Sequence, residues 1–282
     1  ESTVEQQIAG APMIVKCDKP FAYGYTTITE QHGRHSDMLL DFGILKLKSG
    51  DKKVFPPGRE RAWLMIEGTA TFIWGGKKET ITRNSCFDEA PYALHVAKDE
   101  EVTITTDAEC EICVEQVDND KIFTSRLYAP EDVRTDIFGA GTLNETSIRS
   151  VRTVFDGEIN PQSNMVLGEV INHPGKWSSY PPHDHPQPEI YHYRFFPPQG
   201  FGVSLLDDEA HTVKNGYTTL IGPDKTHSQG AAPGYAMYYI WMIPHLPDDR
   251  WLPTTRYFRK EHEWLLEPEV KIWPERKAGS VK

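Results

Sequence analysis

The sequence has few cysteines, no long apolar run and no excess of basic residues, and each shortage excludes a class of protein. Four of its 282 residues are cysteine. Cys110 and Cys113 form a Cys-x-x-Cys pair, but a zinc site of this kind needs a second pair, which the sequence lacks. The low cysteine content is typical of a reducing compartment, so we expect buried or edge-strand thiols in a cytoplasmic protein.

Charge and hydropathy exclude two kinds of partner. No apolar stretch approaches the roughly 20 residues that a membrane-spanning helix needs, and no basic-then-apolar targeting signal opens the chain. The 30 basic and 41 acidic residues give a formal net charge of −11, so we expect neither nucleic acid nor membrane as a partner. An anionic small substrate would need a local Lys or Arg to hold it. Since the chain begins with Glu1 rather than Met, we expect its start to have been trimmed.

Short alternating segments are frequent and long amphipathic helical patterns are scarce, which predicts an all-β fold. The 21 glycines, 21 prolines and 11% aromatic residues favour short strands joined by tight turns. Gly75-Gly76 and Asn215-Gly216 are hairpin turn signals, and the second is the strongest in the sequence. The clearest expected strands are residues 41–48, 62–74, 165–172, 189–196 and 235–243.

One short stretch carries the strongest functional signal. His183 and His185 are two residues apart, so on an extended strand both imidazoles point to one face. Pro186 and Pro188 prevent regular ladder hydrogen bonds, so the chain must turn or run along an edge before a new strand starts at Glu189. Two imidazoles and one carboxylate form a facial ligand set for a divalent metal and leave positions open for substrate or water.

A fourth ligand follows in a second motif. Residues 216–227 contain a strand, a Gly-Pro turn and His227 at the start of the next strand. The two stretches together resemble the paired motifs of the cupin superfamily, Gly…His-x-His-x-x-x-Glu and Gly…Pro-x-x-x-His. This resemblance implies a double-stranded β-helix, or jelly-roll barrel, whose cavity holds a divalent metal at four ligands. The ligands are His183, His185, Glu189 and His227.

The two halves of the chain resemble each other, which predicts two copies of one barrel, a bicupin. Residues 55–60 match 180–185, and residues 91–95 match 223–227. Gly58 replaces the first ligand histidine, so we expect metal only in the second half. The predicted units are an N-terminal degenerate barrel over 1–118, a connection over 119–149, a C-terminal metal-binding barrel over 150–246, and a tail over 247–282 that lies over the surface or a neighbouring subunit.

Alternation places further groups around this site. Tyr191 shares the face of Glu189, and a phenol is a weak acid that can relay a proton. Tyr239 lies on the aromatic strand 235–243, and Lys176 comes just before the ligand strand, where an ammonium group can hold a substrate carboxylate. The predicted catalytic residues are Glu189, Tyr191 and Tyr239. The predicted substrate contacts are Lys176, Tyr180 and Trp241.

The run Gly-Lys-Trp-Ser-Ser-Tyr-Pro-Pro-His-Asp-His at residues 175–185 resembles the metal segment of the 5-deoxy-glucuronate isomerase family of inositol catabolism, which includes a related pectin-pathway uronate isomerase. The resemblance extends over the second half, from 149–152 through 164–170 to 235–241. It implies interconversion of a deoxy-uronic aldose, such as 5-deoxy-glucuronate, and its ketose. It also implies zinc or manganese at the four ligands and a homo-oligomer. The loop 186–188 is shorter than in the inositol-pathway enzymes, so the identity of the sugar acid stays open.

Two other functions fit the same motifs. An iron-dependent bicupin dioxygenase of phenolic compounds would use the same ligand set but needs Fe(II) and oxygen uptake. A non-catalytic sugar-binding cupin would bind its ligand without His183. Four convergent ligands around an open cavity exceed what a packing role needs, and the run 177–185 favours the isomerase over the dioxygenase.

Overall fold

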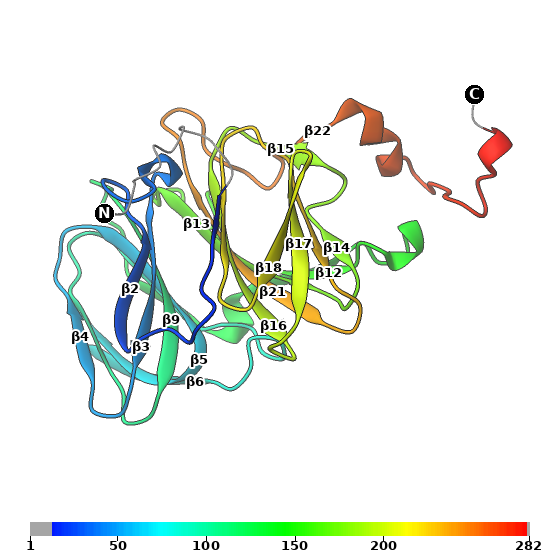
Figure 1. Ribbon diagram of the computed structural model, residues 1–282. Coiled ribbons are helices and arrows are strands. Elements are labelled where there is room, and N and C mark those ends of the chain that lie inside the picture. The colour runs from blue at the N-terminus through cyan, green and yellow to red at the C-terminus, as the bar shows by residue number, and fades with distance from the viewer. Residues whose placement is uncertain (1–12, 281–282) are drawn as a thin grey trace, which may run out of the picture.

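The computed structural model describes residues 13–280, which form an almost entirely β structure (Figure 1). Its 22 strands are joined by turns and five short 3₁₀ helices, so the predicted all-β fold class is confirmed. Within the described residues, no helix is long and apolar enough to cross a membrane. The helices are η1 (Ser36–Met38), η2 (Pro130–Asp132), η3 (Leu143–Glu145), η4 (Lys260–Leu266) and η5 (Ala278–Ser280).

The first half of the chain folds into one curled nine-stranded antiparallel sheet, on the lower left of Figure 1. Strand β5 is its longest strand, with 15 residues, and pairs with four of the other eight. The strands are β2 (Gly24–Thr29), β3 (Asp41–Leu47), β4 (Lys52–Phe55), β5 (Glu60–Trp74), β6 (Lys77–Arg83), β7 (Ala93–Val96), β8 (Val102–Thr105), β9 (Cys110–Val117) and β10 (Arg126–Tyr128).

The second half forms a barrel from a seven-stranded and a four-stranded sheet. The order of the larger sheet is β1-β19-β16-β21-β13-β12-β11, and that of the smaller is β14-β20-β17-β18. The larger sheet comprises β1 (Met13–Val15), β11 (Arg134–Phe138), β12 (Arg149–Phe155), β13 (Met165–Asn172), β16 (Glu189–Phe196), β19 (Thr218–Ile221) and β21 (Ala236–Pro244). The smaller comprises β14 (Trp177–Ser178), β17 (Phe201–Leu206), β18 (Glu209–Lys214) and β20 (His227–Ala231).

Several strands lie outside the predicted unit whose sheet they join. Strand β1, near the start of the described residues, pairs with β19. Within the predicted connection, β10 joins the first sheet and β11 joins the second. In the predicted tail, β22 (Tyr257–Phe258) pairs with β15 (His183–Asp184). The rest of the tail, from η4 onward, projects away from the barrels in Figure 1.

The two strong turn signals have different outcomes. Gly75-Gly76 closes the hairpin between β5 and β6, both residues have positive φ, and Trp74 pairs with Lys77. Asn215-Gly216 also turns the chain, with φ +88° at Gly216, but the predicted hairpin there is wrong. Strand β18 pairs with β17 whereas β19 pairs with β16 and β1. Pairing over long sequence distance therefore sends the two flanking strands into different sheets.

Alternation along the strands divides the apolar side chains among three cores. One core fills the first barrel around Trp63 and Phe72, and another fills the second around Tyr193 and Tyr239. The third lies between the barrels and combines residues of both, such as Leu64 with Ile190. Strands that lie between two of these cores are therefore buried on both faces, which explains the almost continuous burial of β9, β13 and β16.

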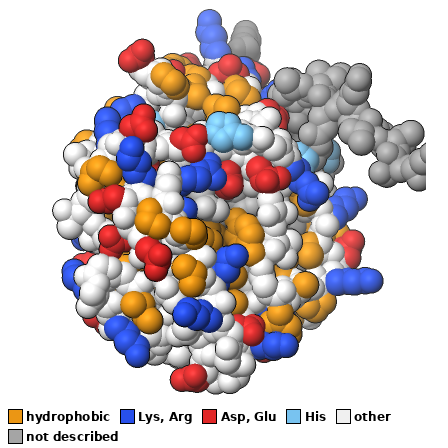
Figure 2. Space-filling view, turned by 90° about the vertical axis from the view of Figure 1, so that its left-hand side faces the viewer, with side chains coloured by type: hydrophobic (Ala, Val, Ile, Leu, Met, Phe, Trp, Pro, Cys, Tyr) orange, Lys and Arg blue, Asp and Glu red, His pale blue; other side chains and the backbone are white. Residues whose placement is uncertain are grey.

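Charges of both signs alternate over the visible surface. On the face shown in Figure 2, Lys and Arg side chains are interspersed with Asp and Glu. A surface that binds nucleic acid concentrates basic residues on one face or stripe. The face in Figure 2 has no such concentration.

Candidate metal centre and substrate cavity

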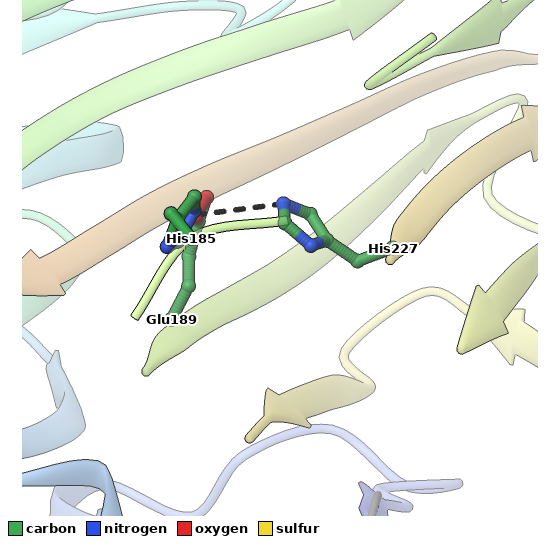
Figure 3. Close-up of side chains that lie close together, drawn as sticks. All are labelled: His185, Glu189 and His227. Atoms are coloured by element: carbon green, nitrogen blue, oxygen red, sulfur yellow. Dashed lines mark hydrogen bonds and ion pairs between the residues drawn. The ribbon is translucent and has the colours of Figure 1, made fainter. Parts of the chain in front are cut away.

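Three buried side chains converge inside the second barrel (Figure 3). His185 Nε2 lies 3.1 Å from Glu189 Oε2, and His227 Nε2 lies 3.8 Å from the same oxygen. All three ligand atoms lie within 4.8 Å of one another. Among residues 13–280, this is the one group of three or more His, Cys, Asp or Glu side chains arranged so closely.

Backbone hydrogen bonds fix which nitrogen of each histidine faces the cavity. The Nδ1 atoms of His183, His185 and His227 lie 2.8, 2.9 and 2.8 Å from the carbonyl oxygens of Pro181, Gln187 and Lys225. A carbonyl oxygen can only accept, so each Nδ1 carries the proton and donates it. In the neutral imidazole each Nε2 then presents a lone pair, which is the form that binds a metal.

Electrostatics favour a cation between these groups. Glu189 Oε2 and His185 Nε2 are both electron-pair donors, and such atoms repel at 3.1 Å unless a proton or metal ion lies between them. Burial, followed by the charge of His227, lowers the pKa of His183 to about 3, and burial lowers the pKa of His227. These two imidazoles are therefore neutral near pH 7. Imidazole nitrogens with one carboxylate oxygen form a donor set that fits a divalent metal ion.

His183 stands slightly apart from the other three predicted ligands. It lines the same cavity, and its ring centroid is 5.7 Å from that of His227. It does not belong to the group within 4.8 Å. The structure therefore brings together His185, Glu189 and His227 most closely, with His183 beside them, and the four-ligand set stays a prediction.

The local fold explains why these residues meet. After His185 the short proline-containing loop returns the chain to Glu189, which begins β16 and pairs with Ile221 of β19. The chain then turns, and the backbone N–H of Asp224 donates to the carbonyl of His185 at 2.9 Å. His227 follows as the first residue of β20. Two strand starts and one loop thus point their side chains at one place.

Two tyrosines predicted as catalytic lie in the wall of this cavity. The rings of Tyr191 and Tyr239 stack with centroids 4.2 Å apart. Tyr239 Oη lies 2.8 Å from Ser178 Oγ, and Tyr191 Oη lies 3.3 Å from Ser179 Oγ. Burial raises the pKa of both phenols, and the negative charge of Glu189 raises it further. Both phenols therefore keep their protons at neutral pH and act as hydrogen-bond donors.

Trp241, predicted as a substrate contact, also lines the cavity. Its indole packs against Trp251, with ring centroids 5.8 Å apart. It also crosses directly over Gly168, where a Cβ atom would lie 2.1 Å from the indole Cζ2. A larger residue at position 168 would collide with this indole, so the glycine allows Trp241 to lie in the cavity wall.

The other two predicted substrate contacts lie elsewhere. Lys176 and Tyr180 are half-buried but are not part of the cavity wall. The cations that do line it are Arg134, Arg149 and Arg256. Sequence reasoning missed all three because no motif surrounds them, although Arg149 begins one of the segments that carries the family resemblance.

His95, at the place of His227 in the predicted repeat, has a different environment. Its Nε2 lies 2.6 Å from Glu60 Oε2, and its ring stacks on Phe155 with centroids 3.8 Å apart. Ser163 and Asn164 also donate to Glu60. His95 therefore takes part in the junction between the barrels.

Comparison with known proteins agrees with this architecture. The model of the KduI/IolB family matches residues 13–265. A curated relative from Geobacillus kaustophilus, named 5-deoxy-glucuronate isomerase, is 30% identical over 199 residues, which cover 61% of this chain and 69% of the relative. The family resemblance predicted from the sequence is therefore confirmed.

Solved structures support the fold. An IolB-like protein from Salmonella typhimurium superimposes with a TM-score of 0.78 at 22% identity, covering 90% of this chain and 99% of that one. A cupin 2 conserved barrel domain protein from Leptotrichia buccalis gives a TM-score of 0.51 at 13% identity, covering 85% and 98%. The predicted bicupin architecture is confirmed by these likenesses and by the two barrels.

Proposed function

This chain belongs to the KduI/IolB family, and from that premise we propose that it is a metal-dependent aldose–ketose isomerase of a deoxy-uronic acid such as 5-deoxy-glucuronate. The observation that carries the proposal is the convergence of His185, Glu189 and His227 in a buried cavity. The name of the Geobacillus relative supports the substrate.

The proposed reaction moves hydrogen within one molecule. In the aldose-to-ketose direction the C2–H bond breaks, a C1–H bond forms, and the proton of the C2 hydroxyl passes to the C1 oxygen. The two electrons of the C2–H bond stay in the carbon skeleton through an enediol, so no oxidant or reductant is needed. The protein must therefore supply a base, a proton donor and stabilisation for negative charge on oxygen.

A divalent ion, when bound, would polarise the carbonyl and lower the pKa of the neighbouring hydroxyl. We assign His183, His185, Glu189 and His227 to hold it. His185, Glu189 and His227 fit because their two Nε2 atoms and a carboxylate oxygen lie within 4.8 Å of one another, and His183 lines the same cavity beside them.

The remaining groups of the cavity supply the proton movement. Asp136 and Asp156 are both paired with Arg134, whereas Glu189 has no arginine partner among the described residues. We assign to Glu189 the carboxylate that receives and returns the carbon-bound proton. The protonated phenols of Tyr191 and Tyr239 donate hydrogen bonds to substrate oxygen where negative charge develops.

The test is conversion of the sugar acid itself. Zinc- or manganese-loaded protein is incubated with 5-deoxy-glucuronate, and the aldehyde and ketone signals are followed by NMR in parallel with a chelated sample. The proposal expects ketose only in the metal-loaded sample and no oxygen uptake. Absence of ketose with metal present contradicts it, and oxygen uptake with Fe(II) would assign the dioxygenase instead.

We also propose, from the sequence and the family relationship, that the protein works as a homo-oligomer in the cytoplasm. The projecting C-terminal segment supports assembly, because Leu266 and Trp273 are exposed by 49% and 73%. Light scattering of the full chain tests this. The expected mass is a multiple of 32.1 kDa, and a monomer at micromolar concentration contradicts assembly.

A further inference from the structure

We infer that Arg149 and Arg256 form the subsite that holds the carboxylate of the substrate, inside the cavity that contains the metal ligands. This inference deepens the proposed function and rests on it. It replaces Lys176 with two arginines as the groups that recognise the acid.

Both arginines face the cavity without a carboxylate of their own. Arg149 Nη1 donates to the carbonyl of Ser147 at 2.8 Å, and Nη2 donates to that of Tyr180 at 3.3 Å. These acceptors are uncharged, so the positive charge of Arg149 is not neutralised. Arg256 is exposed, and no acidic side chain of residues 13–280 lies within ion-pair distance of it. Arg134, by contrast, lies 3.3 Å from Asp136 and 3.7 Å from Asp156.

The fold brings these two residues to one cavity from segments far apart in sequence. Arg149 begins β12, and its guanidinium lies 5.6 Å from the centroid of the Phe138 ring. Arg256 directly precedes β22, whose Phe258 pairs with His183. The strand that carries a metal ligand therefore also anchors the segment that carries Arg256. A positioned guanidinium is suited to bind a carboxylate through two parallel hydrogen bonds.

Charge in the cavity calls for an anion. The charged groups that line the cavity are Arg134, Arg149, Arg256, Asp136, Asp156 and Glu189. A divalent ion would bring their total to five positive charges against three negative ones. Burial lowers the pKa of Arg149, and the nearby Arg256 lowers it too, which reflects mutual repulsion of the two cations. A bound carboxylate would reduce the repulsion between the two guanidinium groups, and their positive charge would attract it.

The size of the cavity suits a small acid. The space open to the centre of a water molecule is about 110 Å³, whereas about 10–15 Å³ holds one water. Several water-sized groups therefore fit, as in a six-carbon sugar acid. A single carboxylate at one end leaves the carbonyl end free to face the metal ligands.

The experiment measures binding separately from turnover. The probe is the acid obtained by reducing C1 of 5-deoxy-glucuronate to an alcohol, which cannot isomerise, and its matched probe is the uncharged amide. Affinities for zinc-loaded protein are measured by calorimetry. If the proposed function is wrong, the wild-type protein does not turn over 5-deoxy-glucuronate. If only the subsite is wrong, the wild type turns it over but the arginine variants keep their affinity for the acid.

We expect Arg149→Met and Arg256→Met each to weaken binding of the acid about ten- to hundredfold, as for other charged hydrogen bonds. Binding of the amide should change less than about threefold. Arg149→Lys and Arg256→Lys should regain part of the loss, since charge remains but the paired hydrogen bonds do not. Arg126→Met, which removes an exposed arginine of β10 outside the cavity, should bind both probes like wild type.

Three outcomes overturn the inference: unchanged affinity for the acid in both methionine variants, equal loss for acid and amide, or tighter binding of a sugar phosphate than of the acid by wild type. The affinities for the acid and for the amide are measured with the same preparation of each variant. Their ratio therefore does not change if part of the protein is unfolded.

Discussion

Arg83 of the first barrel binds Glu169 of the second through two parallel hydrogen bonds of 2.7 and 2.9 Å. Both side chains are almost completely buried, with 1% and 0% exposure. Arg152 and the Tyr238 hydroxyl donate to the same carboxylate. Glu169 lies on β13 beside Gly168 and Val170, so this network ties the first barrel to the strand behind the Trp241 wall of the cavity.

The first prediction concerns this junction. Arg83→Met should lower the free energy of unfolding by about 3–5 kcal/mol, because removing one partner leaves a buried carboxylate undercompensated. Denaturant unfolding measures the change. The surface variant Arg126→Met should differ from wild type by less than about 0.5 kcal/mol. A loss below about 1 kcal/mol in Arg83→Met would show that Arg152 and Tyr238 hold Glu169 without Arg83.

A second prediction comes from Glu115, which is fully buried and whose two carboxylate oxygens have no hydrogen-bond partner within the described residues. Burial raises its pKa well above the usual range, and the charge of Glu60 raises it further. Above about pH 4.3 the unfolded chain loses this proton while the folded chain keeps it. The contribution of Glu115 to stability is therefore greatest below that pH and falls by about 1.4 kcal/mol per pH unit as the pH rises toward the folded pKa.

Glu115→Gln removes this titration. Its free energy of unfolding should exceed that of wild type at pH 8 by at least about 1 kcal/mol, and the difference should shrink toward pH 4. Urea unfolding at several pH values measures it, with the exposed Glu131→Gln as control. A difference that is the same at every pH would assign the effect to packing.

The third prediction concerns zinc affinity. Glu189→Gln keeps the shape of the side chain but removes the charge that faces His185 and His227. Zinc affinity should fall at least about a hundredfold, since loss of even an outer partner of a ligand costs about 10–100-fold. Competition with a chelator measures this. His32→Ala, at an imidazole that is 71% exposed, should bind zinc like wild type.

The fourth prediction distinguishes a catalytic role of the Tyr239 hydroxyl from a role of its ring in packing. Tyr239→Phe removes the hydroxyl that lies 2.8 Å from Ser178 but keeps the stacked ring. The value of kcat for 5-deoxy-glucuronate should fall about 10²–10³-fold with little change in KM, as when one donor to a developing oxyanion is removed. Tyr235→Phe, outside the cavity wall, should keep wild-type kcat. Equal kcat in both variants would limit Tyr239 to packing.

Local signals in the sequence predicted much of this molecule. Alternation located β3, β5 and β13 almost to the residue, because one face of each strand is buried in its own barrel. The convergence of His185 and Glu189 was predicted because they are close in sequence and their spacing requires a shared direction. His227 followed from its own turn motif.

The parts that failed depend on distant pairing. The turn at Gly216 has the right local chemistry, but β16 rather than β18 pairs with the strand after it. Arg149 and Arg256 enter one cavity only because β22 pairs with β15, where the partners His183 and Phe258 are 75 positions apart, and no local pattern encodes that pairing. Lys176 was predicted as a substrate contact from its nearness in sequence to the ligands, and it lies outside the cavity wall.

Anomalous diffraction at the zinc absorption edge, from crystals grown with zinc, tests the metal centre most directly. One strong peak should lie about 2.0–2.2 Å from the Nε2 atoms of His185 and His227 and from a carboxylate oxygen of Glu189. A map with no peak between these three side chains, or with its strongest peak outside the second barrel, would contradict the proposed centre and the isomerase mechanism that depends on it.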